Sequence, residues 1–559
     1  MGEFKNNKLF YGDNLKILRS YIPDESVDLI YLDPPFNSKR AYNVIFKDKT
    51  GEDASAQIEA FEDTWKWTPD VRETYDEIMG GDYSSELKDA VSAFKSFMPK
   101  TDMMAYLTMM AVRLWELRRV LKETGSIYLH CDPTASHYLK VLMDQIFGAS
   151  NFQNEIAWKR TSAHSGSKRW GPVHDILLFY SKSSDFVWNT VYQDYSEKYL
   201  DKFYKYEDDR GRFTVGDLTG SGTRSGDSGK PWKGVNPTDK GRHWGVPNKI
   251  VEKITCEDVG ELSVQEKLDL LDGKGYIYWP PRGSVPRLKR YLDEDKGVPI
   301  VDMITDINVI QAHSNERLGY PTQKPLALLE RIIEASSGEG DVVLDPFCGC
   351  GTAVVAAETL GRKWIGIDVT HLAVALMKNR LKTKFDLDPN VDYDVIGEPE
   401  SVGAAQALAE QSKSQFEFWA VSLVNGKPHK SKGGGDSGID GLLYFKDFEG
   451  KWHKIIIEVK GGGYQPKDVR ALHHVMEREK APMGLLIALK PPTQGMLTEA
   501  AELGKWKMPG SERKYPVMQI FTVEEYFDGR MPDLPDTSET LKKAKRTPRA
   551  NERQRKLDL

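Results

Sequence analysis

Residues suited to methylating a nucleobase follow an apolar run near the start of the chain. Asp33, Pro34, Pro35 and Phe36 come directly after VDLIYL (27–32). The amino nitrogen of adenine is a poor nucleophile, because its lone pair is delocalised into the ring. The Asp33 carboxylate and the Pro34 carbonyl oxygen can accept hydrogen bonds from that amino group, and the two prolines make the turn rigid. Phe36 can stack on a base extruded from the duplex.

A second segment has the pattern of a nucleoside-binding turn. In DVVLDPFCGCGTAVVAAETLGRKWIGID (341–368), one apolar strand is expected to end at Asp345 and another at Asp368, with a glycine-bearing turn and a helix between them. Glycines let a ligand approach the backbone at the carboxyl ends of parallel strands, where Asp368 can bind both ribose hydroxyls. The turn lacks the GxGxxG and GxxxxGK[ST] patterns of phosphate-binding loops. A cofactor without phosphates therefore fits better, and S-adenosylmethionine is such a cofactor.

The C-terminal region carries residues for a different chemistry. The apolar runs GLLYF (441–445) and KIIIEV (454–459) predict an antiparallel hairpin that places Asp440 beside Glu458. Lys460 shares the face of Glu458, because side chains alternate along a strand. Two carboxylates and a lysine can hold Mg²⁺ and a water near a phosphate, as in metal-assisted hydrolysis of phosphodiesters.

Alternating strands and helices must position these groups. Apolar runs at 27–32, 125–131 and 175–181 predict buried strands, and helical spacing occurs at 103–121. The same alternation resumes after residue 321, so the sequence predicts an α/β fold with a parallel sheet. Residues 190–300 are rich in Gly, Asp, Arg and Tyr and read as a loop-rich insertion.

Composition limits the class of protein. A chain of 559 residues with 40% hydrophobic residues is expected to form two to four packed domains. An N-terminus without an apolar signal core, apolar runs too short for a bilayer and only four cysteines predict a cytoplasmic protein that does not act in a membrane. The net charge is −6, yet phosphate contacts need only local basic faces. The candidates for DNA contacts lie at Lys159, Arg160, Lys168, Arg169, Arg282, Arg287 and Arg290.

The order of these motifs resembles the permuted (beta-class) amino-methyltransferases of DNA. Asp33–Phe36 matches their catalytic tetrapeptide, and Asp345–Thr352 matches their cofactor loop. YPTQKPLALLERII (320–333) is similar to their flanking cofactor-binding helix, and FYGDNLKIL (10–18) to the segment that contacts the cofactor adenine. The resemblance implies a Rossmann-like S-adenosylmethionine-dependent methyltransferase fold with a circularly permuted seven-stranded mixed sheet, acting on double-stranded DNA. The implied cofactor-binding residues are Asp13, Lys324, Asp345, Phe347, Gly349, Gly351, Thr352 and Asp368.

The first residue of the tetrapeptide bears on the target base. In this family Asp rather than Ser points to adenine N6, with cytosine N4 as the alternative. RNA guanine methyltransferases place the cofactor loop first, and protein glutamine methyltransferases favour Asn at the position of Asp33, so both are minor alternatives. A monomer and a homodimer are both open.

Asp440 and Glu458-Val459-Lys460 resemble the restriction-endonuclease-like nucleases, most closely the Mrr type. The resemblance implies that Asp440 and Glu458 bind Mg²⁺ and that Glu417 assists. The chain would then combine modification and restriction. The alternatives are a C-terminal domain that only binds DNA and a silent DNA-binding partner of another subunit. The expected division is 1–190 and 301–398 for the two methyltransferase halves, 191–300 for target recognition, 399–415 for a linker, 416–530 for the endonuclease-like domain and 531–559 for a basic tail.

Overall fold

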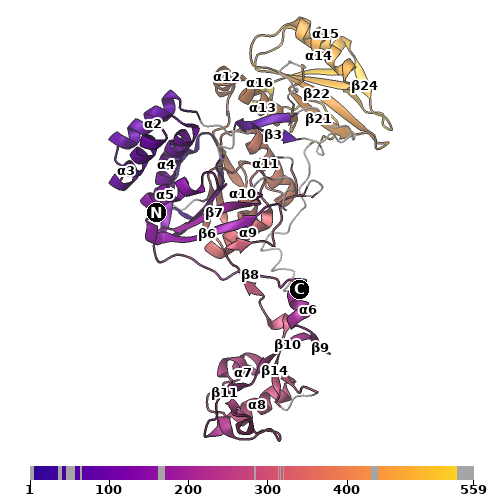
Figure 1. Ribbon diagram of the computed structural model, residues 1–559. Coiled ribbons are helices and arrows are strands. Elements are labelled where there is room, and N and C mark those ends of the chain that lie inside the picture. Colours follow the sequence, from indigo (N-terminus) through magenta and orange to yellow (C-terminus); the bar gives the residue numbers. More distant parts are fainter. Residues whose placement is uncertain are drawn as a thin grey trace. The chain divides into compact units, whose positions relative to one another are not determined.

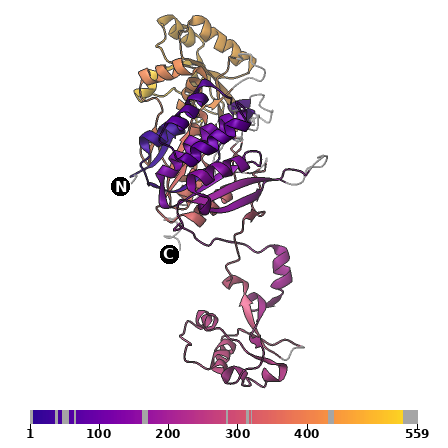
Figure 2. The same cartoon turned by 60° about the vertical axis from the view of Figure 1, so that its left-hand side comes forward.

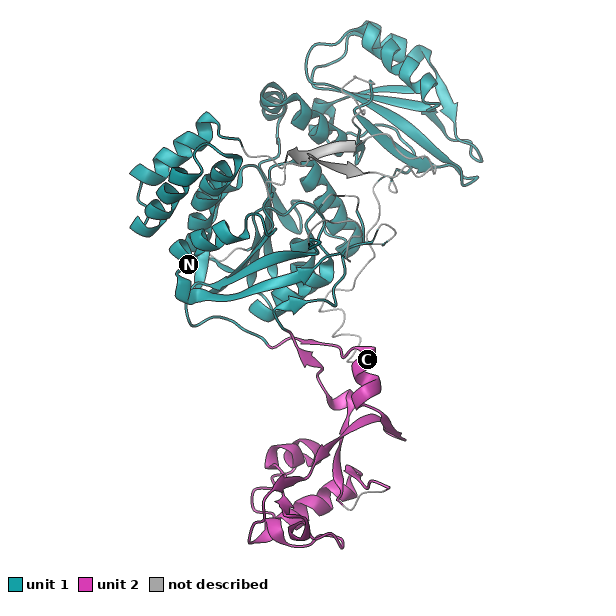
Figure 3. Ribbon diagram, in the orientation of Figure 1, with its two compact units in different colours: residues 1–189, 301–559 teal, residues 190–300 magenta. Residues whose placement is uncertain are grey.

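The computed structural model of the chain describes residues 5–35, 41–45, 57–62, 66–161, 170–281, 285–311, 314, 316–318, 320, 322–429, 438–537 and 540. The chain forms two compact units (Figure 3). One comprises Met1–Asn189 and Val301–Leu559, and the other comprises Thr190–Ile300. No helix in the described ranges has the length and apolar character needed to cross a membrane.

A mixed sheet organises the methyltransferase part of the first unit. Its described strands number nine, and neighbours pair in parallel except β7, which is antiparallel to both β5 and β6. The predicted mixed sheet is confirmed, and the short edge strands β16 and β19 extend it beyond the seven strands expected. In spatial order the strands are β16 (Met303–Ile304), β6 (Phe152–Lys159), β7 (His174–Ser181), β5 (Leu121–Cys131), β2 (Val27–Leu32), β17 (Val342–Asp345), β18 (Lys363–Asp368), β1 (Asn7–Tyr11) and β19 (Tyr393–Ile396).

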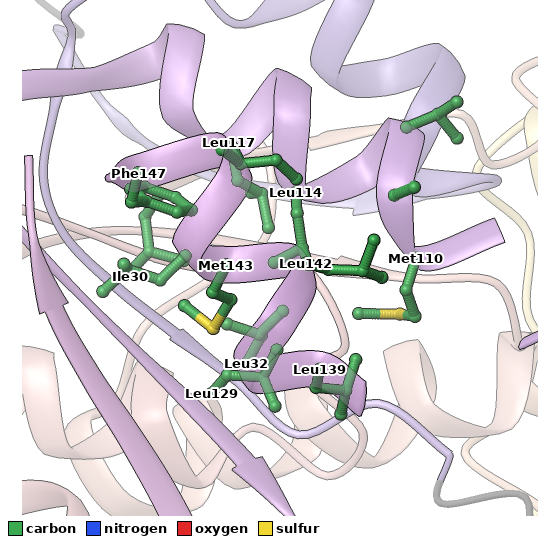
Figure 4. Packing of buried hydrophobic residues seen from close by; sticks show 14 of the residues in the cluster. Ile30, Leu32, Met110, Leu114, Leu117, Leu129, Leu139, Leu142, Met143 and Phe147 are labelled. Atoms are coloured by element: carbon green, nitrogen blue, oxygen red, sulfur yellow. The ribbon is translucent and has the colours of Figure 1, made fainter. Parts of the chain in front are cut away.

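Helices cover both faces of this sheet (Figures 1 and 2). Because side chains alternate along a strand, Ile30 and Leu32 pack on one face and Leu29 on the other. Figure 4 shows the first face, where Leu114 and Leu142 pack near Ile30 and Leu32. Its helices are α1 (Asn14–Tyr21), α2 (Pro69–Gly80), α3 (Ser85–Phe97), α4 (Asp102–Val120) and α5 (Ser136–Phe147), and the second face is covered by α9 (Leu326–Ser336), α10 (Thr352–Thr359) and α11 (His371–Phe385).

The second unit spans the predicted insertion of residues 190–300 and has a folded core of its own, which its loop-rich composition did not predict. A four-stranded sheet packs with helices around Phe213, Trp232 and Trp244. Residues 190–300 contain few long apolar runs because the strands of this unit are short and aromatic side chains make up part of its core. The sheet order is β13 (Ile277–Tyr278), β14 (Arg287–Tyr291), β10 (Gly211–Asp217) and β9 (Tyr206–Asp208), and the helices in the core are α7 (Asn248–Thr255) and α8 (Val264–Gly273).

The C-terminal domain is a smaller α/β fold within the first unit. The predicted hairpin is present, with Gly441 opposite Ile457. The expected linker 399–415 instead contains α12 (Val402–Gln411), whose buried Ala405 and Leu408 pack in the same cluster as Phe416. The sheet order is β20 (Lys427–Pro428), β21 (Gly441–Lys446), β22 (Trp452–Lys460), β23 (Met483–Ala488) and β26 (Met518–Thr522), and the helices named below are α13 (Lys413–Leu423) and α14 (Pro466–Arg478).

Candidate active site

The two methyltransferase motifs meet at one edge of the central sheet. Strand β2 pairs in parallel with β17, with Leu29 opposite Val343 and Ile30 opposite Leu344. The turn after β2 and the loop after β17 therefore leave the sheet side by side. They border a cavity of about 370 Å³. Lining residues proposed from the sequence are Asp13, Asp33, Pro35, Lys324, Asp345, Phe347, Gly349, Thr352 and Asp368.

An ion pair lines this cavity. The Lys324 ammonium contacts the Asp33 carboxylate, and their side chains are only 9% and 15% exposed. Lys324, which was predicted to bind the cofactor, lines the cavity and contacts the carboxylate of the proline turn. Pro34 in that turn is buried, and Phe36 lies outside the described residues.

Hydrogen bonds from its own backbone shape the cofactor loop. Asp368 accepts from the Gly349 N–H at 2.9 Å and from the backbone and hydroxyl of Thr370 at 2.9 and 2.8 Å. Asp345 accepts from the Phe347 N–H at 3.1 Å. Gly351 has φ +75°, and an added Cβ there would lie 2.6 Å from the Met377 side chain. The two carboxylates predicted to bind cofactor therefore also order the loop.

Acidic groups dominate the electrostatics of the cavity. Burial raises the pKa of Asp345 well above its ordinary value, and the nearby charges of Asp33 and Asp368 raise it further. Burial also raises the pKa of Asp368. Carboxylates held together in this way favour a cationic ligand, because a positive charge offsets their repulsion. S-adenosylmethionine carries a sulfonium and an ammonium group, so these residues fit it.

A polar link joins the N-terminal segment to the cofactor loop. Asp13 caps α1 and pairs with the buried Arg113 at 2.9 Å. Arg113 also donates to the Asn14 side chain at 2.7 Å, and Asn14 donates to the Pro346 carbonyl at 2.8 Å. Sequence reasoning missed Arg113 and Asn14. The available signal was Arg113, which directly follows the uncharged run 103–112 of the predicted helix.

A second polar chain crosses the sheet strand by strand. The Tyr31 hydroxyl, which lines the cavity, is 2.9 Å from Nδ1 of the fully buried His130. Nε2 of His130 is 3.4 Å from Asp175, and Asp175 is 3.2 Å from Nε of Arg160. Burial lowers the pKa of His130 and so favours the neutral ring. His130 therefore connects the cavity residue Tyr31 to Asp175.

The expected DNA-contacting residues are spread over both units. Lys159 and Arg160 are exposed where β6 ends. In the second unit, Arg287 lies on β14 and is 3.5 Å from Asp217, and Arg290 lies on the same strand beside Gly216. Lys168, Arg169 and Arg282 lie outside the described residues.

The C-terminal candidates do come together at one end of the hairpin. Asp440 accepts from the Val459 N–H at 2.7 Å, and Lys460 pairs with the buried Glu458 at 2.7 Å. The Lys460 ammonium also lies 3.4 Å from Asp468, which begins α14 and was not predicted. Glu417 on α13 pairs with Lys413 at 3.5 Å.

These contacts bear on the expected Mg²⁺ site. The Asp440 carboxylate is engaged by backbone, and an ammonium group neutralises Glu458. In the part of the chain that the structure describes, no group of three or more His, Cys, Asp or Glu side chains is arranged to hold a metal ion.

Both parts of the chain match models of known protein families. Residues 27–379 match the N6_N4_Mtase family model, described as DNA methylase. Residues 412–528 match the model of NACHT-associated inactive Restriction Endonuclease 1, which does not bear out the expected likeness to the Mrr type or an active nuclease.

Individual relatives align over the methylase part. The type II methyltransferase M.EcaI of Enterobacter cloacae is 31% identical over 67% of this chain and 69% of its own. The StyLTI Mod subunit of Salmonella typhimurium, a type III restriction-modification enzyme, is 27% identical over 65% of this chain and 52% of its own. A putative DNA modification methylase of Thermus thermophilus, solved with S-adenosyl-L-methionine, aligns with 70% of this chain and 99% of its own at 15% identity and a TM-score of 0.30. From the family model and the likeness to M.EcaI, the chain belongs to the N6_N4_Mtase family of DNA methylases.

Proposed function

We propose that this DNA methylase transfers the methyl group of S-adenosylmethionine to N6 of adenine in double-stranded DNA, as the modifying enzyme of a restriction-modification system. The observation that carries the proposal is the cavity shared by the Asp33 turn and the glycine loop, with Asp33, Asp345 and Asp368 around it. The likeness to a type II methyltransferase and to the Mod subunit of a type III restriction-modification enzyme supports the biological setting.

The residues of the chain account for binding and orientation. Asp345, Asp368 and the backbone of the loop at Gly349 would hold the cofactor. When bound, S-adenosylmethionine supplies a methyl group on a positively charged sulfur. Asp33 accepts a hydrogen bond from the target amino group and draws its lone pair out of conjugation, while Lys324 fixes the orientation of the Asp33 carboxylate. Holding two reactants in this way can contribute ~7–11 kcal/mol of the barrier.

The choice of adenine rests on Asp33. A carboxylate at the first position of the tetrapeptide supports adenine N6 through the family resemblance, and cytosine N4 is the competing product. Adenine and cytosine both present an exocyclic amino group, so Asp33 could accept a hydrogen bond from either base. A direct chemical identification of the product is therefore the decisive test.

That test is to express the chain in a host without DNA methylation and to sequence the host DNA with detection of modified bases. We expect N6-methyladenine at one short sequence motif and none with Asp33→Ala. The variant should still bind S-adenosylmethionine, measured by calorimetry. N4-methylcytosine would replace the adenine assignment, and unmodified DNA from a folded, cofactor-binding chain would overturn the proposal.

For the C-terminal domain we propose DNA binding without cleavage. The supporting observations are the ammonium of Lys460 on Glu458 and the description of the matching family as inactive. The competing function, a Mg²⁺-dependent nuclease, is favoured by the convergence of Asp440, Glu458 and Lys460. Methylated and unmethylated target DNA should stay intact with the full chain and Mg²⁺, with or without cofactor. Fragments that disappear with Asp440→Ala would establish the nuclease instead.

A further inference from the structure

A highly exposed tryptophan lies in the connection between β6 and β7. Trp170 is 97% exposed, the highest value of any large hydrophobic side chain that the structure describes. An indole this exposed presents a large flat apolar ring that is available for stacking on a partner. The edge of the sheet at which Trp170 lies indicates which kind of partner its ring can contact.

The topology of the sheet places this connection at the edge that holds the cavity. Strand β5 is parallel to β2, β7 is antiparallel to β5, and β6 is antiparallel to β7. Strand β6 therefore runs in the same direction as β2 and ends at the same edge as Asp33. Strands β6 and β7 lie side by side in Figure 1. The connection that contains Trp170 thus leaves the sheet at the catalytic edge.

The base of this connection is fixed to the cavity wall. The Arg160 and Thr161 N–H groups both donate to the Val173 carbonyl, at 2.9 and 3.3 Å. The Arg160 side chain pairs with Asp175, which continues through His130 to the cavity residue Tyr31. Lys159 and Arg160 also place positive charge at the base of the connection, where a phosphate backbone would be attracted.

We propose that Trp170 inserts into the base stack of the DNA and fills the gap left by the extruded target base. This inference rests on the proposed function, since only an enzyme that acts on an extruded base creates such a gap. Extrusion costs a few kcal/mol of stacking and pairing. An aromatic side chain that stacks on the neighbouring bases recovers part of that cost. Inserted apolar side chains serve this purpose in other DNA-binding proteins.

The test uses the full-length chain and a duplex that contains the motif identified by sequencing, with 2-aminopurine at the target position to report extrusion. We expect Trp170→Ala to reduce kcat/KM on ordinary target DNA by roughly 10- to 100-fold and to reduce the fluorescence increase on binding. Trp170→Phe should retain most of both. Affinity for S-adenosylmethionine should be unchanged, because Trp170 does not line the cavity.

Two controls make the result specific. Placing a mismatched base opposite the target lowers the cost of extrusion, so it should restore the activity of Trp170→Ala. Trp188→Ala, at an exposed tryptophan beyond the other end of β7, should behave like the wild type on both substrates.

The outcomes separate this inference from the proposed function. Equal activity of Trp170→Ala and wild type, or a loss that the mismatch does not restore, overturns the inference alone. A wild-type chain that neither methylates DNA nor extrudes the 2-aminopurine overturns the proposed function, and the inference with it.

Discussion

The ion pair between Lys324 and Asp33 gives a quantitative prediction. Lys324→Met removes the ammonium and keeps a side chain of similar length. It leaves the Asp33 carboxylate in a cavity that also contains Asp345 and Asp368. Breaking a buried pair by removing one partner costs about 3–5 kcal/mol. Since the two side chains are 9% and 15% exposed rather than fully buried, we expect a loss of roughly 3 kcal/mol in the free energy of unfolding.

A double-mutant cycle isolates this interaction. Urea unfolding of the full chain is followed by circular dichroism for the wild type, Lys324→Met, Asp33→Asn and the double variant. Because the double variant no longer holds an unpaired charge, it should be more stable than the sum of the single losses predicts, by more than about 1 kcal/mol. The comparison relies on differences between variants, since a chain of several domains does not unfold in two states.

An exposed pair provides the matched control. Lys382 lies 2.8 Å from Asp388, with side chains 47% and 52% exposed, so Lys382→Met should cost less than about 1 kcal/mol. If Lys324→Met costs no more than this control, or if the cycle shows no coupling, the ion pair does not stabilise the site. Both Lys324→Met and Asp33→Asn should also lose methyl transfer, assayed with labelled cofactor.

Two further predictions concern the cofactor loop. The raised pKa values of Asp345 and Asp368 should fall when a cation binds, so binding releases protons and the affinity for S-adenosylmethionine rises with pH above the ordinary carboxyl range. Calorimetry in buffers of different ionisation enthalpy measures the number of protons released. Binding of S-adenosylhomocysteine, which lacks the sulfonium charge, should release fewer protons. Equal proton release by the two ligands would contradict the reasoning. Gly351→Ala forces a left-handed φ and a 2.6 Å approach to Met377, costing about 2–5 kcal/mol. A lower melting temperature and weaker cofactor binding are expected, with Gly462→Ala as an unstrained control; unchanged melting would refute the strain.

Local patterns in the sequence predicted the elements that carry the motifs. The run 27–32 matches β2 residue for residue, since a strand covered on both faces has a continuous apolar signature. The predicted hairpin likewise placed Asp440 close to Glu458, because a short turn fixes the register of the two strands that it joins. For strand β2 and for the hairpin, the residues that determine the local structure are close together in the sequence.

Contacts between distant segments could not be predicted in the same way. Lys324 and Asp33 are separated by 291 positions, and nothing in either motif specifies that they touch. The chain from Tyr31 through His130 to Asp175 depends on the order of three strands, which one sequence does not reveal. The folded core of the insertion was not predicted, because short strands and scattered aromatic residues give a weak periodic signal.

The first and last strands of the second unit pair with each other, so the chain enters and leaves this unit at the same place. Strand β8 (Tyr192–Gln193) pairs with β15 (Val298–Pro299), with Gln193 opposite Val298. A unit whose two ends are paired in this way can be replaced by one of different length without displacing the strands of the large sheet that hold the cavity. The sequence predicts that this unit recognises the DNA target, and on that prediction its replacement alone should change the recognised sequence while the methyl-transfer site stays in place.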